Sequence, residues 1–558
     1  MNRVYSYFLK KYVMAQKFYF ILVCITTIAQ SFLTMCIPLT YQKLLDEAFP
    51  DKDVQKFWLM IVTMLACYFG AAALNVCKDF LLARVAENIT MDLRIELNEK
   101  ISLMKYSYFD DHSLNGILSK FNREIEAVKE NCGYMLVKTL SNLVTFIMAA
   151  AMIISMEWKI MCVSVILLTI YVLNNKFWGK KVKKLAERSM EGNEETLGVL
   201  TENYRNVLIT KLYSAYQYVN DKFERTYKKQ YKTQMALEVT YSVNINTGGL
   251  LNYLLSGAIW VIGGIGIFAG RLTVGTVTAL INYQNMLIGP LTFFTEFNNS
   301  YQSTIIAMKR LLSVLLYEEE SNEGYDISNE NINQVRFTDV VFKYSKSEGI
   351  LEDINLDMEK GQMYAFIGGS GCGKSTLVKM LLGLYFPADG AIYVNSHNMQ
   401  SLSLKSVRNK IAFVAQDSLF YQGTIIENLT MGNKIDDTQM IHYSKLLDVY
   451  DEILKLPEQW ETILNSGTTN LSGGQKKRLD VLRALLREAD VIIFDESTAS
   501  IDLERRNKLF DVLKQIKKDK IIICITHNLE ECIHFDKVFG VRDKHVYPVP
   551  ANNLQEAY

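Results

Sequence analysis

Six long apolar runs without charged residues recur in the first 300 residues and constrain the fold more than any other feature. They cover residues 18–42, 57–77, 139–156, 160–175, about 250–270, and 272–295. About 20 helical residues span the hydrocarbon core of a bilayer, so most of these runs are long enough to cross it. One such run would also fit a buried helix of a soluble domain, but six in one half of a chain cannot all be buried in that way. The sequence therefore predicts an all-α transmembrane domain with six helices.

The distribution of lysine and arginine predicts the orientation of these helices. Basic residues are frequent in the N-terminal segment and in the two long loops at 78–138 and 176–238, whereas the other connections are short or only moderately long. Positively charged loops stay on the cytoplasmic side. We therefore expect a multi-pass protein of the cell membrane with both termini and both long loops in the cytoplasm.

Composition limits the classes of partner and of site. Lys plus Arg and Asp plus Glu both number 60, so the net charge gives no argument for nucleic acid as a partner. The nine cysteines include no C-x-x-C pair, which indicates reduced, buried thiols.

From about residue 334 the pattern changes to short strands, glycine turns and helices, typical of an α/β domain. We expect a transmembrane domain at 1–315, a linker at 316–333 and an α/β P-loop domain at 334–558.

Residues 368–376 read Gly-Gly-Ser-Gly-Cys-Gly-Lys-Ser-Thr and satisfy the phosphate-loop pattern G-x-x-x-x-G-K-[ST]. An apolar run at 363–367 predicts a buried strand before this loop, and a helix begins near Lys374. Backbone N–H groups of such a loop wrap phosphate oxygens closely, and the helix N-terminus adds partial positive charge. We expect ATP to be bound by the nine-residue loop, with the contacts made by Gly368, Gly371, Gly373, Lys374, Ser375 and Thr376. The Ser375 hydroxyl is predicted to hold Mg²⁺.

Further candidate site residues follow in order along the chain. Tyr344 is placed to stack on adenine, and the amide of Gln416, after the apolar run at 411–415, is placed to reach Mg²⁺ and the attacking water. The turn Leu-Ser-Gly-Gly-Gln at 471–475 feeds a second helix and predicts a second phosphate contact. Three residues then come at the ends of buried strands: Asp495 for Mg²⁺, Glu496 as general base, and His527.

These residues together resemble the ATP-binding cassette transporters. Tyr344 is similar to the adenine-stacking aromatic residue, Gln416 to the glutamine loop, and Ser472, Gly473, Gly474 and Gln475 to the signature. Asp495 and Glu496 resemble the Walker B end, Asp502 the D-loop and His527 the switch histidine. The first half is similar to exporters whose six helices precede the cassette, at 108–116, 272–276 with Pro290, and 307–310. The chain departs from many exporters at 466–470, where an acidic residue is frequent, and at Ala415, where proline is frequent.

The resemblance implies a dimer of half-transporters that exports a substrate by alternating access. ATP would be held between residues 368–376 of one chain and 471–475 of the other, and Asp502 would lie at the same interface. Glu496 would polarise the attacking water, while Lys374, Mg²⁺, Gln416 and His527 stabilise charge on the transferred phosphoryl group. Both halves of the composite site are intact in this chain, which favours a homodimer and leaves a heterodimer open.

The motifs do not identify the transported substrate. Polar residues of the sixth run suggest a polar or cationic-amphipathic cargo such as a peptide, in contact with Glu296 near Asn298 and Asn299. Hydrogen bonds between helices are the alternative role for these side chains. An ATP-gated receptor or channel, or an importer variant of the same fold, is the alternative function.

Overall fold

The computed structural model describes residues 3–112, 117–118, 120–344, 349–464, 471–498 and 501–550, apart from the side chains of Asp111 and of several residues between 292 and 303. The described chain forms two compact units. The first comprises Met1–Ser102 and Leu114–Tyr317, and the second comprises Leu103–Ser113 and Glu318–Tyr558.

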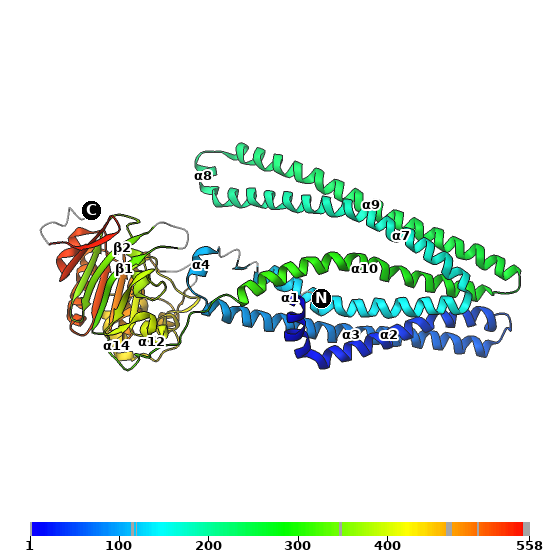
Figure 1. The fold of residues 1–558 in the computed structure, drawn as a ribbon, viewed down its shortest axis with the longest axis horizontal. Helices are drawn as coiled ribbons and strands as arrows, with labels where there is room; N and C mark the ends of the chain where they lie inside the picture. The colour runs from blue at the N-terminus through cyan, green and yellow to red at the C-terminus, as the bar shows by residue number, and fades with distance from the viewer. Residues whose placement is uncertain are drawn as a thin grey trace. The chain divides into compact units, whose positions relative to one another are not determined.

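The first unit is built from helices, several of them much longer than a bilayer crossing. Figure 1 shows α7 and α9 as long antiparallel helices joined through the short α8. The elements in chain order are α1 (Arg3–Phe8), η1 (Leu9–Val13), η2 (Met14–Gln16), α2 (Lys17–Lys43), η3 (Leu44–Ala48), α3 (Val54–Leu103), η4 (Lys120–Glu124), α6 (Ile125–Val128), η5 (Lys129–Met135), α7 (Leu136–Arg205), α8 (Val207–Leu212), α9 (Tyr216–Phe268) and α10 (Val274–Leu315).

The six predicted spans fall on α2, α3, α7, α9 and α10. Two of them share α7, which is interrupted between them where Glu157 leaves the helical conformation at φ −157° and ψ 97°. By length and composition, four helical stretches among the described residues are apolar enough to cross a membrane: Arg3–Ala48, Val54–Leu103, Lys120–Arg205 and Tyr216–Phe268. The sixth predicted span begins on α10, several of whose side chains lie outside the description.

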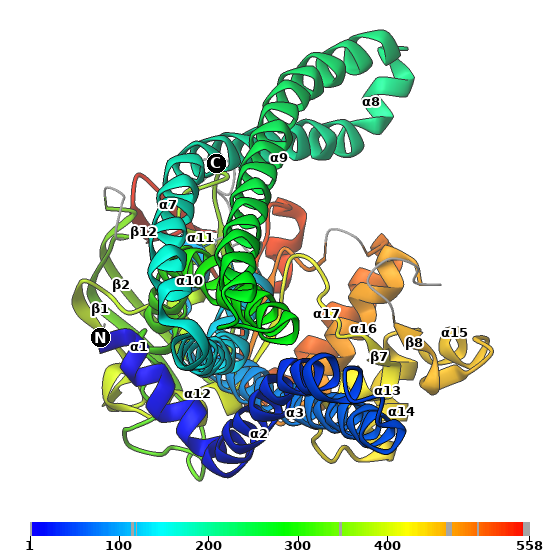
Figure 2. The ribbon, with the colours of Figure 1, turned by 90° about the vertical axis from the view of Figure 1, so that its right-hand side faces the viewer.

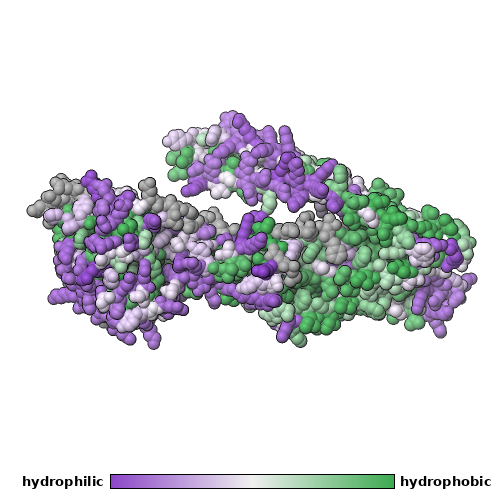
Figure 3. Space-filling model, in the orientation of Figure 1, coloured by the Kyte–Doolittle hydropathy of each residue, from purple (hydrophilic) through white to green (hydrophobic). Residues whose placement is uncertain are grey.

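Hydropathy changes along these helices. In Figure 3 the arm of α7 and α9 that leads to α8 is mainly hydrophilic, whereas the part of the helices away from α8 is covered mainly by apolar residues, with hydrophilic residues again at the far tip. Helices satisfy their own backbone hydrogen bonds, so the apolar part needs no water. The same continuous helices therefore serve a lipid-facing part and a water-facing part.

The second unit contains a small antiparallel sheet and a mainly parallel sheet. The antiparallel order is β2-β1-β4-β5 and the six-stranded order is β12-β11-β3-β10-β9-β6, with β12 antiparallel to β11. The strands are β1 (Gln334–Phe342), β2 (Leu351–Glu359), β3 (Met363–Ile367), β4 (Asp389–Val394), β5 (His397–Asn398), β6 (Ile411–Val414), β7 (Gly423–Thr424), β8 (Ile463–Leu464), β9 (Val491–Asp495), β10 (Ile521–Ile525), β11 (Lys537–Arg542) and β12 (His545–Pro548).

Helices accompany these strands, and Figure 2 shows α13, α14 and α15 grouped with β7 and β8 beside α16 and α17, away from β1 and β2. The helices and helical turns are α4 (Ser107–Asp111), α11 (Lys374–Leu381), η6 (Met399–Ser401), α12 (Leu404–Asn409), α13 (Ile425–Thr430), α14 (Asp437–Leu446), α15 (Tyr450–Leu454), η7 (Gln459–Glu461), α16 (Gly473–Leu486), α17 (Leu503–Ile516), η8 (Lys517–Asp519) and η9 (Leu529–His534).

The parallel sheet is buried on both faces. Alternate residues of β10 enter two separate apolar clusters: Ile521, Ile523 and Ile525 pack with the antiparallel sheet, and Ile522 and Cys524 pack with the helical group. A parallel sheet covered on both faces needs continuous apolar strands rather than alternating ones. This explains why the runs before Asp495 and His527 read as uninterrupted apolar segments.

Segment 103–113 is joined to the second unit by backbone hydrogen bonds. Glu320 N donates to Leu103 O at 2.8 Å, and Arg408 pairs with the Glu320 carboxylate through two nitrogens at 2.6 and 3.0 Å. Residues 103–113 and 318–333 therefore belong to the same compact unit as the α/β part of the chain. The predicted domain limits, 1–315, 316–333 and 334–558, stay predictions.

The N-terminus of α10 makes a specific contact with η3. The Asp46 carboxylate accepts hydrogen bonds from Gly275 N, at 2.9 Å, and from the Thr273 hydroxyl. We expect Asp46→Ala to destabilise the protein by about 1–2 kcal/mol, because the helix loses an anionic partner for its free N–H groups. The apparent melting temperature in detergent should fall, while Asp51→Ala, which removes an exposed carboxylate paired with Lys56, leaves it nearly unchanged. Equal shifts for both variants would contradict this role of Asp46.

Candidate nucleotide site

The phosphate loop lies between a fully buried strand and the start of α11. All five residues of β3 are buried, and Gly373, at φ +110°, caps α11. The Lys374 ammonium is buried and donates to Gly368 O and Gly369 O, each at 2.8 Å. The loop therefore curls around its own cation, with helix N–H groups beside it, and this arrangement fits a bound phosphate.

Gly368 is required by close packing as well as by its conformation. Its φ is +148°, and a Cβ there would lie 2.4 Å from Val541 O. The next residue, Gly369, has open space where its Cβ would be. The two adjacent glycines thus differ sharply in what a methyl group would meet.

Three parallel strands deliver the predicted catalytic residues to one sheet edge. Neighbouring strands β6, β9 and β10 are followed by Gln416, Glu496 and His527. Gln416 Nε2 donates to Glu496 Oε2 at 2.8 Å, and His527 Nε2 contacts Glu496 Oε1. Glu496 itself adopts φ +48°, a left-handed backbone conformation that is uncommon for residues other than glycine. The carboxylate is therefore held from two sides by polar groups.

Asp495 ends β9 and lies close to Glu496 in both sequence and space. Burial and the negative charge of Glu496 raise the pKa of Asp495, while the Lys374, Lys477 and His527 charges act in the opposite direction. The phosphate loop follows β3 and Asp495 ends β9, and both strands pair with β10. Hydroxyl, amide and carboxylate oxygens of Ser375, Gln416 and Asp495 are a donor set that suits Mg²⁺.

Tyr344 follows β1 and packs beside α11. Its ring lies edge-on to Phe342 and Tyr385, with centroid distances of 4.9 and 5.1 Å. Its hydroxyl lies 3.3 Å from Thr376 Oγ1. The structure thus places the predicted adenine-stacking ring next to the phosphate loop.

The signature turn forms the N-terminal cap of α16. Ser472 Oγ accepts from Gln475 N at 3.3 Å, and Gln475 Oε1 accepts from Ser472 N at 2.8 Å. Gly473 and Gly474 open the helix. Among the described residues, no hydrogen bond joins this turn to the phosphate loop. The departure expected at 466–470 lies outside the described residues.

Asp502 caps α17 in the same manner. It accepts a hydrogen bond from Arg505 N at 3.1 Å and pairs with the Arg505 guanidinium at 3.1 Å. These hydrogen bonds and the Arg505 charge hold the pKa of Asp502 below its usual value. The structure therefore gives Asp502 a helix-capping role, and its predicted contact with nucleotide stays a prediction.

The short helix α4 contacts the cassette close to Tyr344. Asp110 contacts the Tyr385 hydroxyl and lies 3.6 Å from Lys379 Nζ. The Lys379 ammonium lies 5.2 to 5.9 Å from the ring centroids of Tyr106, Tyr344 and Tyr385. One lysine is therefore shared between α4 and the predicted adenine-binding tyrosine.

Sequence reasoning missed several residues that position this site. Ser497 Oγ donates to Val414 O at 2.9 Å and so ties the end of β9 to the end of β6. Lys477 and Tyr385 were not singled out either. For Lys477 a signal existed, because it shares a face of α16 with the buried residues Val481 and Ala484, four and seven positions later.

The polar residues of the sixth predicted span make hydrogen bonds where they are described. Gln284 Oε1 accepts from the Ser164 hydroxyl at 2.8 Å, and Asn252 Nδ2 lies 3.5 Å from Asn285 Oδ1. Asn282 bonds Thr278 O in its own helix. These contacts agree with the alternative of bonding between helices. The side chains of Glu296, Asn298 and Asn299 lie outside the description.

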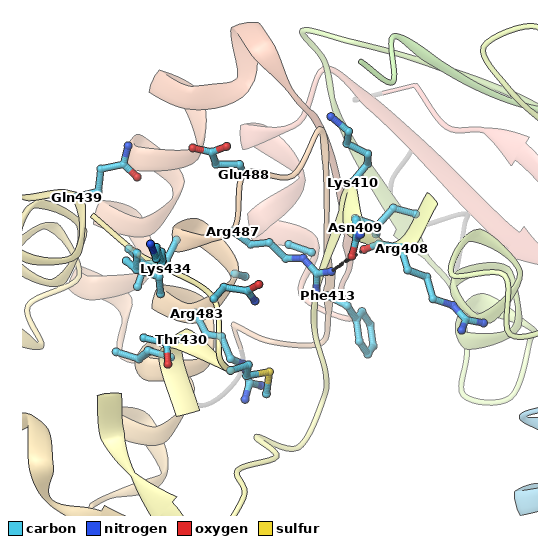
Figure 4. A pocket seen from close by; sticks show the side chains of 18 of the residues that line it. Arg408, Asn409, Lys410, Phe413, Thr430, Lys434, Gln439, Arg483, Arg487 and Glu488 are labelled. Atoms are coloured by element: carbon cyan, nitrogen blue, oxygen red, sulfur yellow. Dashed lines mark hydrogen bonds between the residues drawn. The ribbon is translucent and has the colours of Figure 1, made fainter. Parts of the chain in front are cut away.

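A hollow of about 870 Å³ lies beside the start of β6 and the C-terminal end of α16. Gln416 follows the opposite end of β6. Figure 4 shows Arg408, Lys410, Arg483 and Arg487 around it. None of the predicted site residues lines this hollow. It is therefore separate from the nucleotide site.

Long membrane helices together with a phosphate-loop domain define a membrane protein with a nucleotide-binding cassette. The family model for the ABC transporter transmembrane region matches residues 20–291, and the ABC transporter model matches residues 351–499. The chain therefore belongs to the ATP-binding cassette transporters, and ATP is the nucleotide that this family's cassette binds.

Similar proteins agree with this assignment. The chain is 24% identical to the ATP-dependent lipid A-core flippase of Syntrophus aciditrophicus, covering 91% of this chain and 84% of that protein. It is 24% identical to a putative multidrug export ATP-binding/permease protein of Staphylococcus aureus, covering 84% and 82%. The fold matches the structure of a bacterial Atm1-family ABC exporter with ATP bound, with a TM-score of 0.78, 18% identity, and 98% and 96% coverage.

The two adjacent glycines of the phosphate loop allow a matched test. We expect Gly368→Ala to weaken ATP binding at least tenfold, about 1.4 kcal/mol, because the loop must move away from Val541 O. Gly369→Ala adds the same methyl group into open space and should keep the affinity nearly unchanged. Equilibrium binding of a fluorescent ATP analogue to the purified protein measures both. Equal loss in the two variants would show that loop geometry at Gly368 is not the cause.

Proposed function

We propose that the chain is an ATP-driven exporter that works as a dimer of two identical chains with its cassettes in the cytoplasm. The observation that carries this proposal is the Glu496 carboxylate held between Gln416 and His527 at the sheet edge that also bears the phosphate loop. An inactive nucleotide fold would not require this cluster. The membrane helices supply the part of the molecule that the hydrolysis would drive.

In the proposed reaction each residue has a separate task. Glu496 orients the attacking water and accepts its proton, and the contacts from Gln416 and His527 hold the carboxylate in place for this. Lys374 and His527 stabilise negative charge on the transferred phosphoryl group. Ser375, Gln416 and Asp495 hold Mg²⁺, which supplies positive charge to the phosphate oxygens when bound.

The arrangement of the cassette supports a dimer. One chain has one phosphate loop and one signature turn, and no hydrogen bond joins them within the described chain. Two chains packed head to tail would place the signature of each against the nucleotide of the other, completing two sites. Because Glu496, His527 and residues 471–475 are all intact, a second copy of this chain is sufficient as partner.

The contact of α4 supports a link between nucleotide and membrane helices. Segment 103–113 continues directly from α3, and Asp110 reaches Lys379 and Tyr385 beside Tyr344. Filling the adenine site would change the environment of these tyrosines and hence of α4. We propose that this contact is one route by which ATP binding moves the helices.

For the cargo we propose an amphipathic molecule. The names of the two relatives refer to a lipid A-core flippase and to multidrug export, and they favour export over the channel or importer alternatives. A cationic peptide in contact with Glu296 is a narrower form of the same proposal.

The first test is ATP hydrolysis by the chain purified alone in lipid nanodiscs. We expect activity that is lost at least a hundredfold in Glu496→Gln, because the variant keeps the size of the side chain but cannot accept a proton. Glu488→Gln, an exposed carboxylate at the far hollow, is the matched control and should retain activity. The assay can then screen amphipathic compounds by their stimulation of the rate.

Two outcomes would oppose the proposal. Folded protein that binds ATP but does not hydrolyse it would oppose a self-sufficient homodimer and indicate a different partner chain or an obligatory substrate. Activity that persists in Glu496→Gln would exclude Glu496 as the base.

Tyr344 gives a further prediction. Tyr344→Phe removes only the hydroxyl near Thr376 and should keep ATP affinity, whereas Tyr344→Ala removes the stacking ring and should weaken binding about fivefold, from roughly 1 kcal/mol of lost stacking. Titration calorimetry with ATP, and with tripolyphosphate as a ligand that lacks adenine, distinguishes the causes. If Tyr344→Ala weakens tripolyphosphate binding as much as ATP binding, the ring does not act on adenine.

A further inference from the structure

The loop that carries Gln416 is held by two cations from the helix that begins with the signature. Lys477 Nζ donates to Gln416 O at 2.8 Å and also bonds Ala415 O. Arg483 donates to Leu419 O at 2.9 Å. Both cations lie on α16, whose first turn is the signature. The helix therefore holds the loop at residues 415–416 and again at Leu419.

Lys477 is unusual for a lysine because only 2% of its surface is exposed. Burying an ammonium group is costly unless its donors are hydrogen-bonded, and a leucine would fill the same space without this cost. The negative charges that face it belong to Asp417, Asp480 and Asp495. The lysine is therefore explained by its bonds to the loop and not by packing.

A second tie joins the opposite end of α16 to the start of β6. Arg487 donates to Arg408 O at 2.9 Å and lies 3.4 Å from Asn409 Oδ1, the contact drawn in Figure 4. The helix is thus bonded to the segment 408–419 at both ends. Lys477 and Arg483 contact the Gln416 loop itself, so a movement of α16 would carry this loop with it, whereas Arg487 contacts residues before β6.

We propose that Lys477 is a positioning residue that fixes Gln416 to the signature helix, so that engagement of the signature by the partner's nucleotide places Gln416 correctly against Glu496 in the chain's own site. The inference rests on the proposed dimer and deepens it. It makes the two composite sites of the dimer depend on each other through one side chain in each cassette.

The geometry indicates how sensitive the rate should be. The Gln416 amide reaches Glu496 at 2.8 Å, and the backbone carbonyl of the same residue is the one that Lys477 holds. A shift of about 1 Å in a positioned group can cost about a hundredfold in rate. Release of this carbonyl should therefore affect the chemical step more than ATP binding.

The test compares Lys477→Met, Lys477→Gln and Arg487→Met in the full chain in nanodiscs. We expect Lys477→Met to lower kcat roughly ten- to a hundredfold, with little change in KM, and to reduce the Hill coefficient for ATP toward 1. Lys477→Gln should recover part of kcat, because an amide can still donate to one carbonyl. Arg487→Met removes a cation from the same helix away from Gln416 and should keep both kcat and the Hill coefficient.

Hydrogen exchange gives a readout that does not need hydrolysis. In the Glu496→Gln background, ATP should slow exchange of the amides at 415–420, and Lys477→Met should abolish this slowing without weakening ATP binding. An inactive parent protein would count against the proposed function, while the exchange result would still decide the role of Lys477. If Lys477→Met keeps the slowing, or in active protein keeps kcat and the Hill coefficient, the inference is wrong.

Discussion

The parallel pairing of β3, β10, β9 and β6 is the interaction on which the nucleotide site depends. Parallel strands end at the same edge, so this pairing brings the phosphate loop, His527, Glu496 and Gln416 together, although His527 lies more than 150 residues after the phosphate loop. Burial on both faces makes the register strict, because apolar side chains fill both clusters. The polar groups can then lie only where the strands stop.

The membrane half obeys a different constraint, which is the satisfaction of backbone hydrogen bonds without water. Helices meet it internally, so a span can continue into the aqueous phase with no change of structure. Helix α7 shows this by carrying two predicted spans and a long hydrophilic arm, with one departure from helical geometry at Glu157. Glu157, followed by Trp158 and Lys159, lies where the chain reverses direction between the two spans.

Much of this could be predicted from the sequence, because the strongest signals are local. Apolar runs identified the helices of the first unit, and the glycine pattern with its preceding strand identified the phosphate loop. The grouping of 103–113 with the cassette could not be predicted, since it depends on contacts between Glu320 and Leu103 and between Asp110 and Tyr385 that are distant in sequence. Lys477 was missed because a lysine on a helix is usually solvated, and the apolar pattern around it does not show which strand α16 packs against.

The two segments expected to face a partner chain are joined within one cassette by charged side chains. Arg478 on α16 and Arg505 on α17 bind opposite oxygens of Glu452, at 2.7 and 3.1 Å. Arg505 also pairs with Asp502, so the cap of α17 is connected to the signature helix through three ion pairs. The links from Lys477 to the Gln416 loop end instead on backbone carbonyls, which hold no titratable proton near neutral pH. The signature helix is thus connected to Asp502 through ion pairs and to Gln416 through Lys477, and Gln416 in turn contacts Glu496. Under the proposed dimer, a displacement of this helix would be passed to the Glu496 carboxylate through these contacts.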